Sequence, residues 1–161
     1  MAPSCADAEG HGLRERSADR NLSERGRFRS VSAYERLAVD APPDAVVSAL
    51  REALRSRAIT EYAVVDHGRD MAAAGATGFV AWTLVFGNPA AGAKLLEREL
   101  AAAVDIPLRL AVIAGESGGS EIVRRDMRSL LSDDLAGLAD AFNEVLRALA
   151  EDARERATGA S

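Results

Sequence analysis

The pattern of apolar and polar positions along this chain predicts five strands and four helices. Short runs rich in β-branched and other apolar residues predict the strands, and apolar residues at intervals of three and four predict the helices. The predicted strands are Ser32–Val39, Thr60–Asp66, Phe79–Phe86, Leu108–Ile113 and Ser120–Arg125. The predicted helices cover 44–57, a short Ala-rich stretch within 66–75, Pro89–Ala102, and Ser132 to about Ala153.

The junction after Phe86 is the most informative point of the pattern. Gly87 allows the chain to turn, and Asn88 suits a helix N-cap because its side chain accepts a hydrogen bond from an exposed N–H. Pro89 suits the first helical position, where its missing N–H leaves no extra orphan donor. The sequence therefore predicts that a buried strand leads directly into a capped helix.

The order of these elements predicts an α+β fold. Helices alternate with the first strands, but Gly115–Gly119 predicts a turn that joins the last two strands as an antiparallel hairpin. We expect a two-layer sandwich with helices on one face of one sheet and a long C-terminal helix. A doubly wound parallel sheet is the alternative, which the hairpin and the missing glycine-rich phosphate loop disfavour.

Length and composition predict one ordered domain over residues 31–155. Residues 1–30 are polar and are expected to form a disordered tail, as are residues 156–161. The single cysteine, Cys5, allows no internal disulfide, and no signal peptide or membrane span is recognisable, so we expect a cytoplasmic protein. The net charge of −5 argues against a nucleic-acid partner.

Three sequence blocks carry a resemblance to a known family. They are Asp66-His67 with Ala73 and Gly75, Leu84-Val-Phe-Gly-Asn-Pro89 with Gly92 and Leu96, and Asp105-Ile-Pro-Leu-Arg109. In order and spacing they resemble the domain-of-unknown-function 302 family over roughly residues 31–153, with Ile106 where the family usually has Leu. The resemblance implies a curved, mainly antiparallel sheet of the TATA-binding-protein-like class and a homodimer. It implies no established activity.

The candidate ligand site draws on all three blocks: His67, Gly87, Asn88, Pro89, Asp105 and Arg109. His67, within Asp66-His67-x-x-Asp70, has the residue types of a general base beside a carboxylate, although a structural histidine is the favoured interpretation. No metal site is expected, because neither a second histidine nor a cysteine stands near it in the sequence. The helix end at Asn88 suits either simple capping or a small anionic ligand. Asp105 and Arg109 are expected to form an ion pair.

The leading hypothesis is a non-catalytic homodimer that binds a small ligand or a protein partner at these residues. No cofactor can be named. One alternative is an enzyme with His67 as acid/base and an anion site at Asn88. The other is a purely structural dimer, in which an apolar face with Trp82 and Leu84 packs against a second copy.

Overall fold

The computed structural model of the chain describes residues 29–31 and 34–159. Its strands are β1 (Arg29–Val31), β2 (Tyr34–Val39), β3 (Thr60–Asp66), β4 (Ala81–Gly87), β5 (Leu108–Ala114) and β6 (Ser120–Arg125). Its α-helices are α1 (Pro43–Ser56), α2 (His67–Ala73), α3 (Pro89–Leu96) and α4 (Ala136–Thr158). Four 3₁₀ turns join them: η1 (Leu100–Val104), η2 (Glu116–Gly118), η3 (Met127–Ser129) and η4 (Asp133–Leu135).

All five predicted strands are present, with ends within two residues of the prediction. β1 was not predicted, and it begins inside the segment that was expected to be a disordered tail. The rest of that prediction falls on residues 1–28, outside the described residues.

The strands form one antiparallel sheet in the order β1-β2-β6-β5-β4-β3. β5 and β6 pair as the predicted hairpin, with Ala114 opposite Ser120 and η2 between them. Every neighbouring pair is antiparallel. The fold is therefore the expected α+β sandwich, and the parallel-sheet alternative was wrong.

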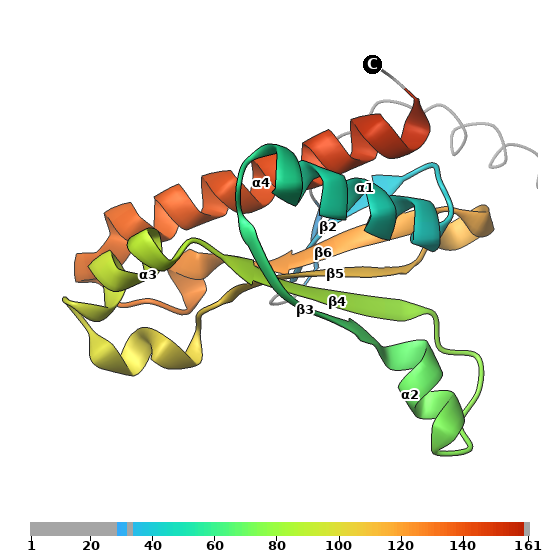
Figure 1. Ribbon diagram of the computed structural model, residues 1–161, viewed down its shortest axis with the longest axis horizontal. Helices are drawn as coiled ribbons and strands as arrows, with labels where there is room; N and C mark the ends of the chain where they lie inside the picture. Colours follow the sequence, from blue (N-terminus) through green and yellow to red (C-terminus); the bar gives the residue numbers. More distant parts are fainter. Residues whose placement is uncertain (1–28, 32–33, 160–161) are drawn as a thin grey trace, which may run out of the picture.

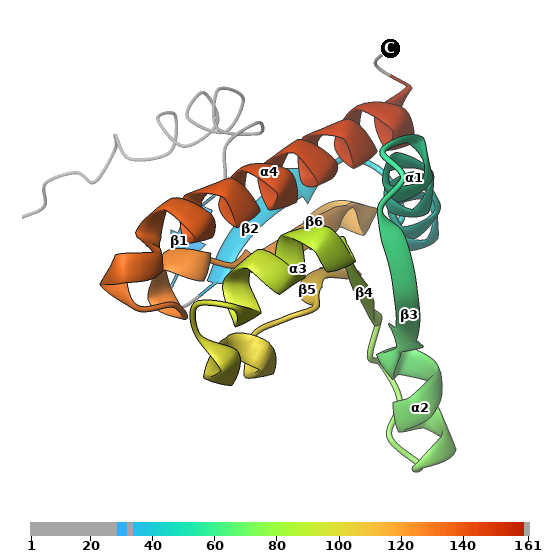
Figure 2. The ribbon, with the colours of Figure 1, turned by 60° about the vertical axis from the view of Figure 1, so that its left-hand side comes forward.

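The helices α1 and α4 lie across one face of this sheet, and α3 lies at its end, where β4 leads into it (Figures 1 and 2). The side chains that point toward them alternate along the strands, and several are completely buried: Leu37, Leu84, Leu110, Val112 and Ile122. One alternative placed Leu84 and Trp82 against a second copy, and this was wrong for Leu84. Leu84 is 0% exposed against the protein's own helices, and Trp82 lies on the same face of β4.

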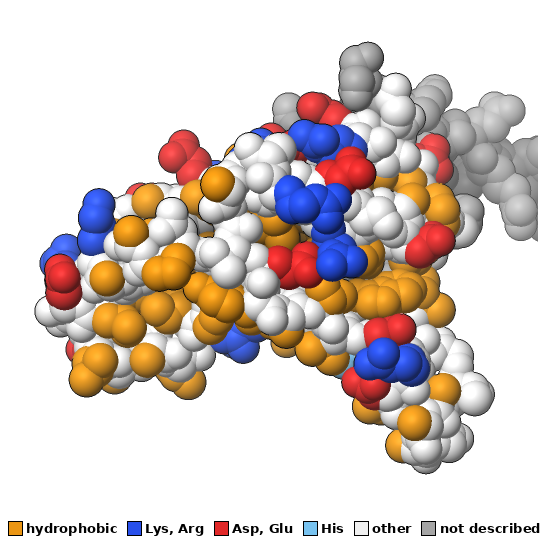
Figure 3. All heavy atoms as spheres, in the orientation of Figure 1, with side chains coloured by type: hydrophobic (Ala, Val, Ile, Leu, Met, Phe, Trp, Pro, Cys, Tyr) orange, Lys and Arg blue, Asp and Glu red, His pale blue; other side chains and the backbone are white. Residues whose placement is uncertain are grey.

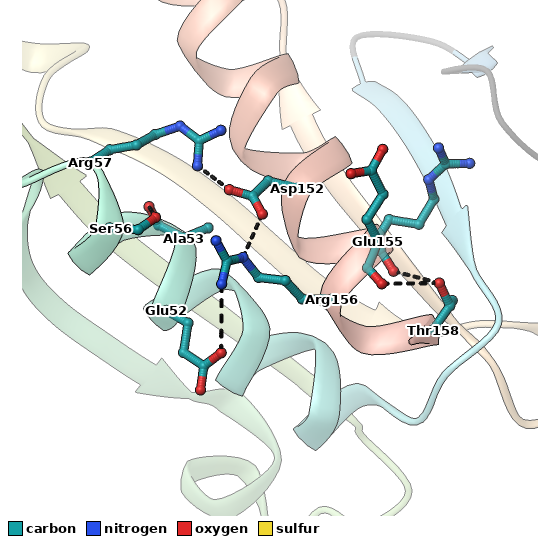
Figure 4. A network of polar contacts seen from close by, with 9 residues as sticks. Glu52, Ala53, Ser56, Arg57, Asp152, Glu155, Arg156 and Thr158 are labelled. Carbon is teal, nitrogen blue, oxygen red and sulfur yellow. Dashed lines mark hydrogen bonds and ion pairs between the residues drawn. The ribbon is translucent and has the colours of Figure 1, made fainter. Parts of the chain in front are cut away.

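An ion-pair network joins α1 to α4 (Figure 4). The carboxylate of Asp152 accepts hydrogen bonds from Arg57, at the end of α1, and from Arg156, one turn further along α4. Arg156 also lies 3.9 Å from a carboxylate oxygen of Glu52 on α1. The network therefore connects the C-terminal part of α1 to the C-terminal half of α4.

A second polar cluster lies under α4 and is buried. The Arg124 side chain on β6 is 0% exposed and forms an ion pair with Glu35 on β2. Arg124 also donates to Oδ1 of Asn143 on α4 at 2.7 Å, and the same oxygen accepts from the backbone N–H of Met127. Burial lowers the pKa of Arg124, and the carboxylate of Glu35 opposes this shift.

No described helix covers the opposite face of the sheet, which we call the helix-free face. Its central side chains are half-buried and apolar: Val65, Val85, Ala111, Ile113 and Val123. α2 projects beyond the edge of the sheet in both ribbon views, carried by β3 and β4 (Figures 1 and 2). The fold thus has one completed hydrophobic core and one uncovered apolar face.

Two helix boundaries differ from the predictions. The helix after Asn88 ends at Leu96 instead of Ala102, because the chain becomes extended at Glu99, whose carboxylate caps η1 by accepting from the Ala101 N–H. The last helix continues to Thr158 and ends at Gly159, which has the left-handed conformation that glycine adopts without strain. The predicted fraying near Ala153 was therefore wrong, because Ala153 is fully buried.

Candidate functional site

The strand-to-helix junction has the predicted geometry. β4 ends at Gly87, and Asn88 is the N-cap of α3, with Oδ1 accepting from the Ala90 N–H at 2.9 Å. Pro89 is the first residue of the helix. The capping interpretation is thus confirmed, and the Nδ2 group of Asn88 has no hydrogen-bond partner among the described residues.

A pocket of about 460 Å³ opens beside this junction. We call it the α3 pocket, and its lining is Tyr62, Gly87, Asn88, Pro89, Gly92, Ala93, Leu96, Ala103, Ile106, Pro107, Leu108 and Phe142. These residues come from β3, the β4–α3 junction, α3, η1, the segment between η1 and β5, the start of β5, and α4. None of them carries a charge. A volume of this size lies within the range of small-molecule sites.

The surface around the α3 pocket is unusually apolar. Hydrophobic side chains gather over α3 and η1 in the space-filling view (Figure 3). Leu100 and Val104 on η1 are 73% and 77% exposed, and Tyr62 is 50% exposed. Contiguous exposed apolar surface of this kind marks binding sites on soluble proteins.

His67 does not belong to the α3 pocket. It is the first residue of α2 and is half-buried, and its Nε2 lies 2.9 Å from Oγ1 of Thr83 on β4. The neighbouring Asp66 is engaged as the N-cap of α2, accepting from the Arg69 N–H at 2.9 Å. Asp70 forms an ion pair with Arg69. The two carboxylates thus have other partners than the imidazole.

His67 and Asn88 stand at opposite ends of β4. Thr83, the partner of His67, is five residues before Asn88, which corresponds to about 16 Å along a strand. Hydrogen bonding to one reacting group requires both side chains within about 3 Å of it. The structure does not bring this predicted acid/base and anion pair together, so that version of the enzyme hypothesis loses its geometric basis.

Asp105 and Arg109 also lie outside the α3 pocket, on either side of Ile106–Leu108. Arg109 donates to the backbone oxygen of Val104 at 3.2 Å rather than to Asp105, so the predicted ion pair was wrong. The exposed Arg109 side chain lies on the helix-free face, because its neighbours Leu108 and Leu110 point into the core. Of the six candidate residues, the structure brings together only Gly87, Asn88 and Pro89.

Sequence reasoning missed most of the pocket lining. Tyr62 stands at a register shift of β3, where a bulge interrupts the alternation that would have revealed its direction. Phe142 matched the periodicity of a core helix and carried no signal of its own. Gly92 was the one detectable indication, since a glycine inside a predicted helix lowers helix stability and so usually has a packing or functional reason.

The described residues lack two other features that would indicate a function. They contain no group of three or more His, Cys, Asp or Glu side chains placed to hold a metal ion. Within the same residues, no helix has the length and apolar character of a membrane span. The titratable groups with shifted pKa values belong to ion pairs outside the α3 pocket; for example, a hydrogen bond from Arg128 lowers the pKa of Asp140.

Comparisons with known proteins agree with this description. The family described as "Domain of unknown function DUF302" matches residues 35–156. The crystal structure of an uncharacterized conserved DUF302 protein from Bacillus stearothermophilus is similar, with 18% sequence identity and a TM-score of 0.70. The similarity covers 77% of this chain and 100% of that one. No curated protein matches. Because the family match extends over most of the chain, the protein is a member of the DUF302 family.

Proposed function

We propose that this protein is a binding module for a small, uncharged, mainly apolar molecule, and that the α3 pocket is its site. The observation that carries the proposal is the pocket of about 460 Å³ with no charged side chain in its lining. An engineered apolar cavity of about 150 Å³ binds benzene, so this space suits a ligand of roughly two or three rings or an equivalent chain.

The lining favours an uncharged ligand over the anionic one that the helix end suggested. An anion would lose most of its hydration in a pocket of prolines, alanines and aliphatic side chains, with no cation to compensate. Asn88 supplies the polar contact, because its Nδ2 group can donate to one acceptor of the ligand while Oδ1 caps α3. His67, Asp105 and Arg109 have no part in this site.

The test is binding of N-phenyl-1-naphthylamine, a neutral dye that fluoresces in apolar surroundings. We expect saturable binding of one dye per chain. Ala93→Phe places a large side chain in the lining from an exposed position on α3, and it should weaken binding at least tenfold. Ala90→Phe is the matched control, since Ala90 is also exposed on α3 but does not line the pocket. Unsaturable binding, or equal effects of the two variants, would refute the proposal.

We also propose that the protein is a homodimer and that the helix-free face is its interface. The supporting observation is a half-buried apolar strip, including Val85, Ile113 and Val123, that no described helix covers. The same face carries charges of both signs, with Arg36 and Glu121 paired at 2.6 Å and Arg125 beside them. A two-fold interface needs such self-complementary composition, because the same patch must meet itself.

Sedimentation velocity tests the dimer. The wild-type protein should sediment as a dimer at micromolar concentration. Val85→Glu, on the helix-free face, should produce a monomer, because dimerisation would bury the new carboxylate. Val145→Glu on the outer side of α4 is the control, where Val145 is already 38% exposed. A wild-type monomer, or a Val85→Glu variant that remains dimeric, would contradict the proposed interface. The cytoplasmic location stays a prediction.

A further inference from the structure

Gly92 lies inside a helix without a conformational reason. It is the fourth residue of α3, its backbone is helical, and glycine destabilises a helix interior relative to alanine. A Cβ atom at this position would meet Cδ1 of Ile106 at 3.4 Å, an ordinary contact distance. At Gly68 and Gly119, by contrast, a Cβ would lie 2.5 and 2.8 Å from a backbone oxygen. Neither conformation nor close backbone approach therefore requires glycine at position 92.

The position of Gly92 in the α3 pocket supplies a reason. The residues of α3 that line the pocket are Pro89, Gly92, Ala93 and Leu96, which recur at three- and four-residue spacing and so form one helix face. Gly92 lies in the middle of this face, opposite Ile106 at the entry to β5. Because a single added carbon would already touch Ile106, a longer side chain at position 92 would have to extend past Ile106 into the α3 pocket.

We infer that Gly92 determines the size of the ligand that the α3 pocket accepts. This inference rests on the proposed binding function and adds that an apolar part of the ligand lies against α3 at Gly92, beside Ile106. A side chain of two or more carbons at position 92 would occupy that part of the pocket. The pocket would then retain room for a single ring near Tyr62 and Pro107 but not for a ligand of two or three rings.

Graded substitutions with two probes test the inference. We expect Gly92→Ala to weaken binding of N-phenyl-1-naphthylamine about threefold and Gly92→Leu at least tenfold. The smaller probe is benzene, whose binding is measured by the shift it causes in the thermal unfolding midpoint. That shift should stay within twofold of the wild-type value in both variants, because benzene does not need the part of the pocket beside Gly92.

Gly137 provides the matched control. It is the second residue of α4, it is exposed, and a Cβ there would meet nothing within 4 Å. Gly137→Ala and Gly137→Leu should bind both probes with wild-type affinity. Gly92→Ala and Gly137→Ala should both raise the urea midpoint, since alanine favours the helix at either site. Loss of dye binding at position 92 therefore cannot be attributed to unfolding.

The outcomes separate the two proposals. If the wild-type protein binds neither probe, the proposed function fails, and the role of Gly92 fails with it. If the wild-type protein binds the dye but Gly92→Leu binds it within twofold of the same affinity, the pocket hypothesis stands and the inference about Gly92 is overturned. Equal weakening of dye and benzene would also overturn it, because Gly92 would then affect binding without selecting for size.

Discussion

The buried ion pair between Arg124 and Glu35 gives a quantitative test of how this fold is stabilised. The two side chains differ in exposure: Arg124 is 0% exposed, whereas 23% of the Glu35 side chain is exposed. An Arg124 guanidinium without its carboxylate stays charged inside the protein, because arginine does not deprotonate at ordinary pH. A Glu35 carboxylate without its arginine can turn toward water. The loss in the free energy of unfolding should therefore depend on which of the two side chains is removed.

Glu35→Ala should lower the free energy of unfolding by about 3 kcal/mol, the lower end of the cost of breaking a buried pair. Arg124→Met keeps the apolar volume and leaves only the partly exposed Glu35 without its partner, so we expect the free energy of unfolding to fall by about 1 kcal/mol. The double variant should resemble Arg124→Met alone, because removing Glu35 matters only while the buried cation is present. Asp140→Ala is the control, because its pair with Arg128 is exposed and should contribute much less to the free energy of unfolding.

Urea unfolding followed by circular dichroism measures these differences, and the fluorescence of the single tryptophan, Trp82, gives a second probe. A loss of about 3 kcal/mol corresponds to a fall in the midpoint of roughly 1–3 M for slopes typical of small domains. The reasoning is refuted if Arg124→Met costs more than Glu35→Ala, or if Glu35→Ala costs no more than the exposed-pair control. The reasoning would also be contradicted if the losses in the two single variants simply added up in the double variant.

Three further predictions concern individual contacts. Burial opposes ionisation of Asp152, but hydrogen bonds from two arginines hold its pKa below the ordinary value of 3.8. The ionised carboxylate therefore contributes fully to the free energy of unfolding above that pH. This contribution is lost as the pH falls through the lower pKa of the folded state. Asp152→Asn should therefore lower the urea midpoint at pH 7 but not near pH 2. Ser120→Ala should lower the free energy of unfolding, measured in urea, by about 1–2 kcal/mol, because the buried Ser120 hydroxyl donates to the Ala41 oxygen at 2.6 Å. Gly119→Ala should lower the thermal midpoint, because its Cβ would lie 2.8 Å from the Val39 oxygen; an unchanged midpoint would show that the strands move apart freely.

Local sequence determined the elements of this protein because their signals act over a few residues. The Gly87-Asn88-Pro89 run set the end of β4 and the start of α3, since the cap, the fixed proline angle and the first free N–H groups lie within one helical turn. The periodicity of Val46, Leu50 and Leu54 likewise determined the buried face of α1. The errors occurred where the signals are weakest, as at Glu99, where helix-forming residues continue past the end of α3.

The candidate site was predicted only where it coincides with such a local signal. Gly87, Asn88 and Pro89 line the α3 pocket because the junction itself borders it. His67 has a chemically suggestive neighbour in Asp66, but its contact with Thr83 places it at the opposite end of β4 from Asn88. Sequence proximity of catalytic residue types therefore carried no information about their distance from Asn88.

The sequence by itself determined the α+β class, the antiparallel hairpin and the capped helix, because propensity, capping and periodicity are properties of neighbouring residues. Tertiary structure alone decided which sheet face the helices cover, and hence that Leu84 is in the core and Val85 is on the helix-free face. It also decided that Tyr62, Gly92, Ile106 and Phe142 enclose one pocket. These residues are separated by up to 80 positions, and only the packing of α3 and α4 on the sheet brings them together, since a pocket is the space that several elements leave unfilled.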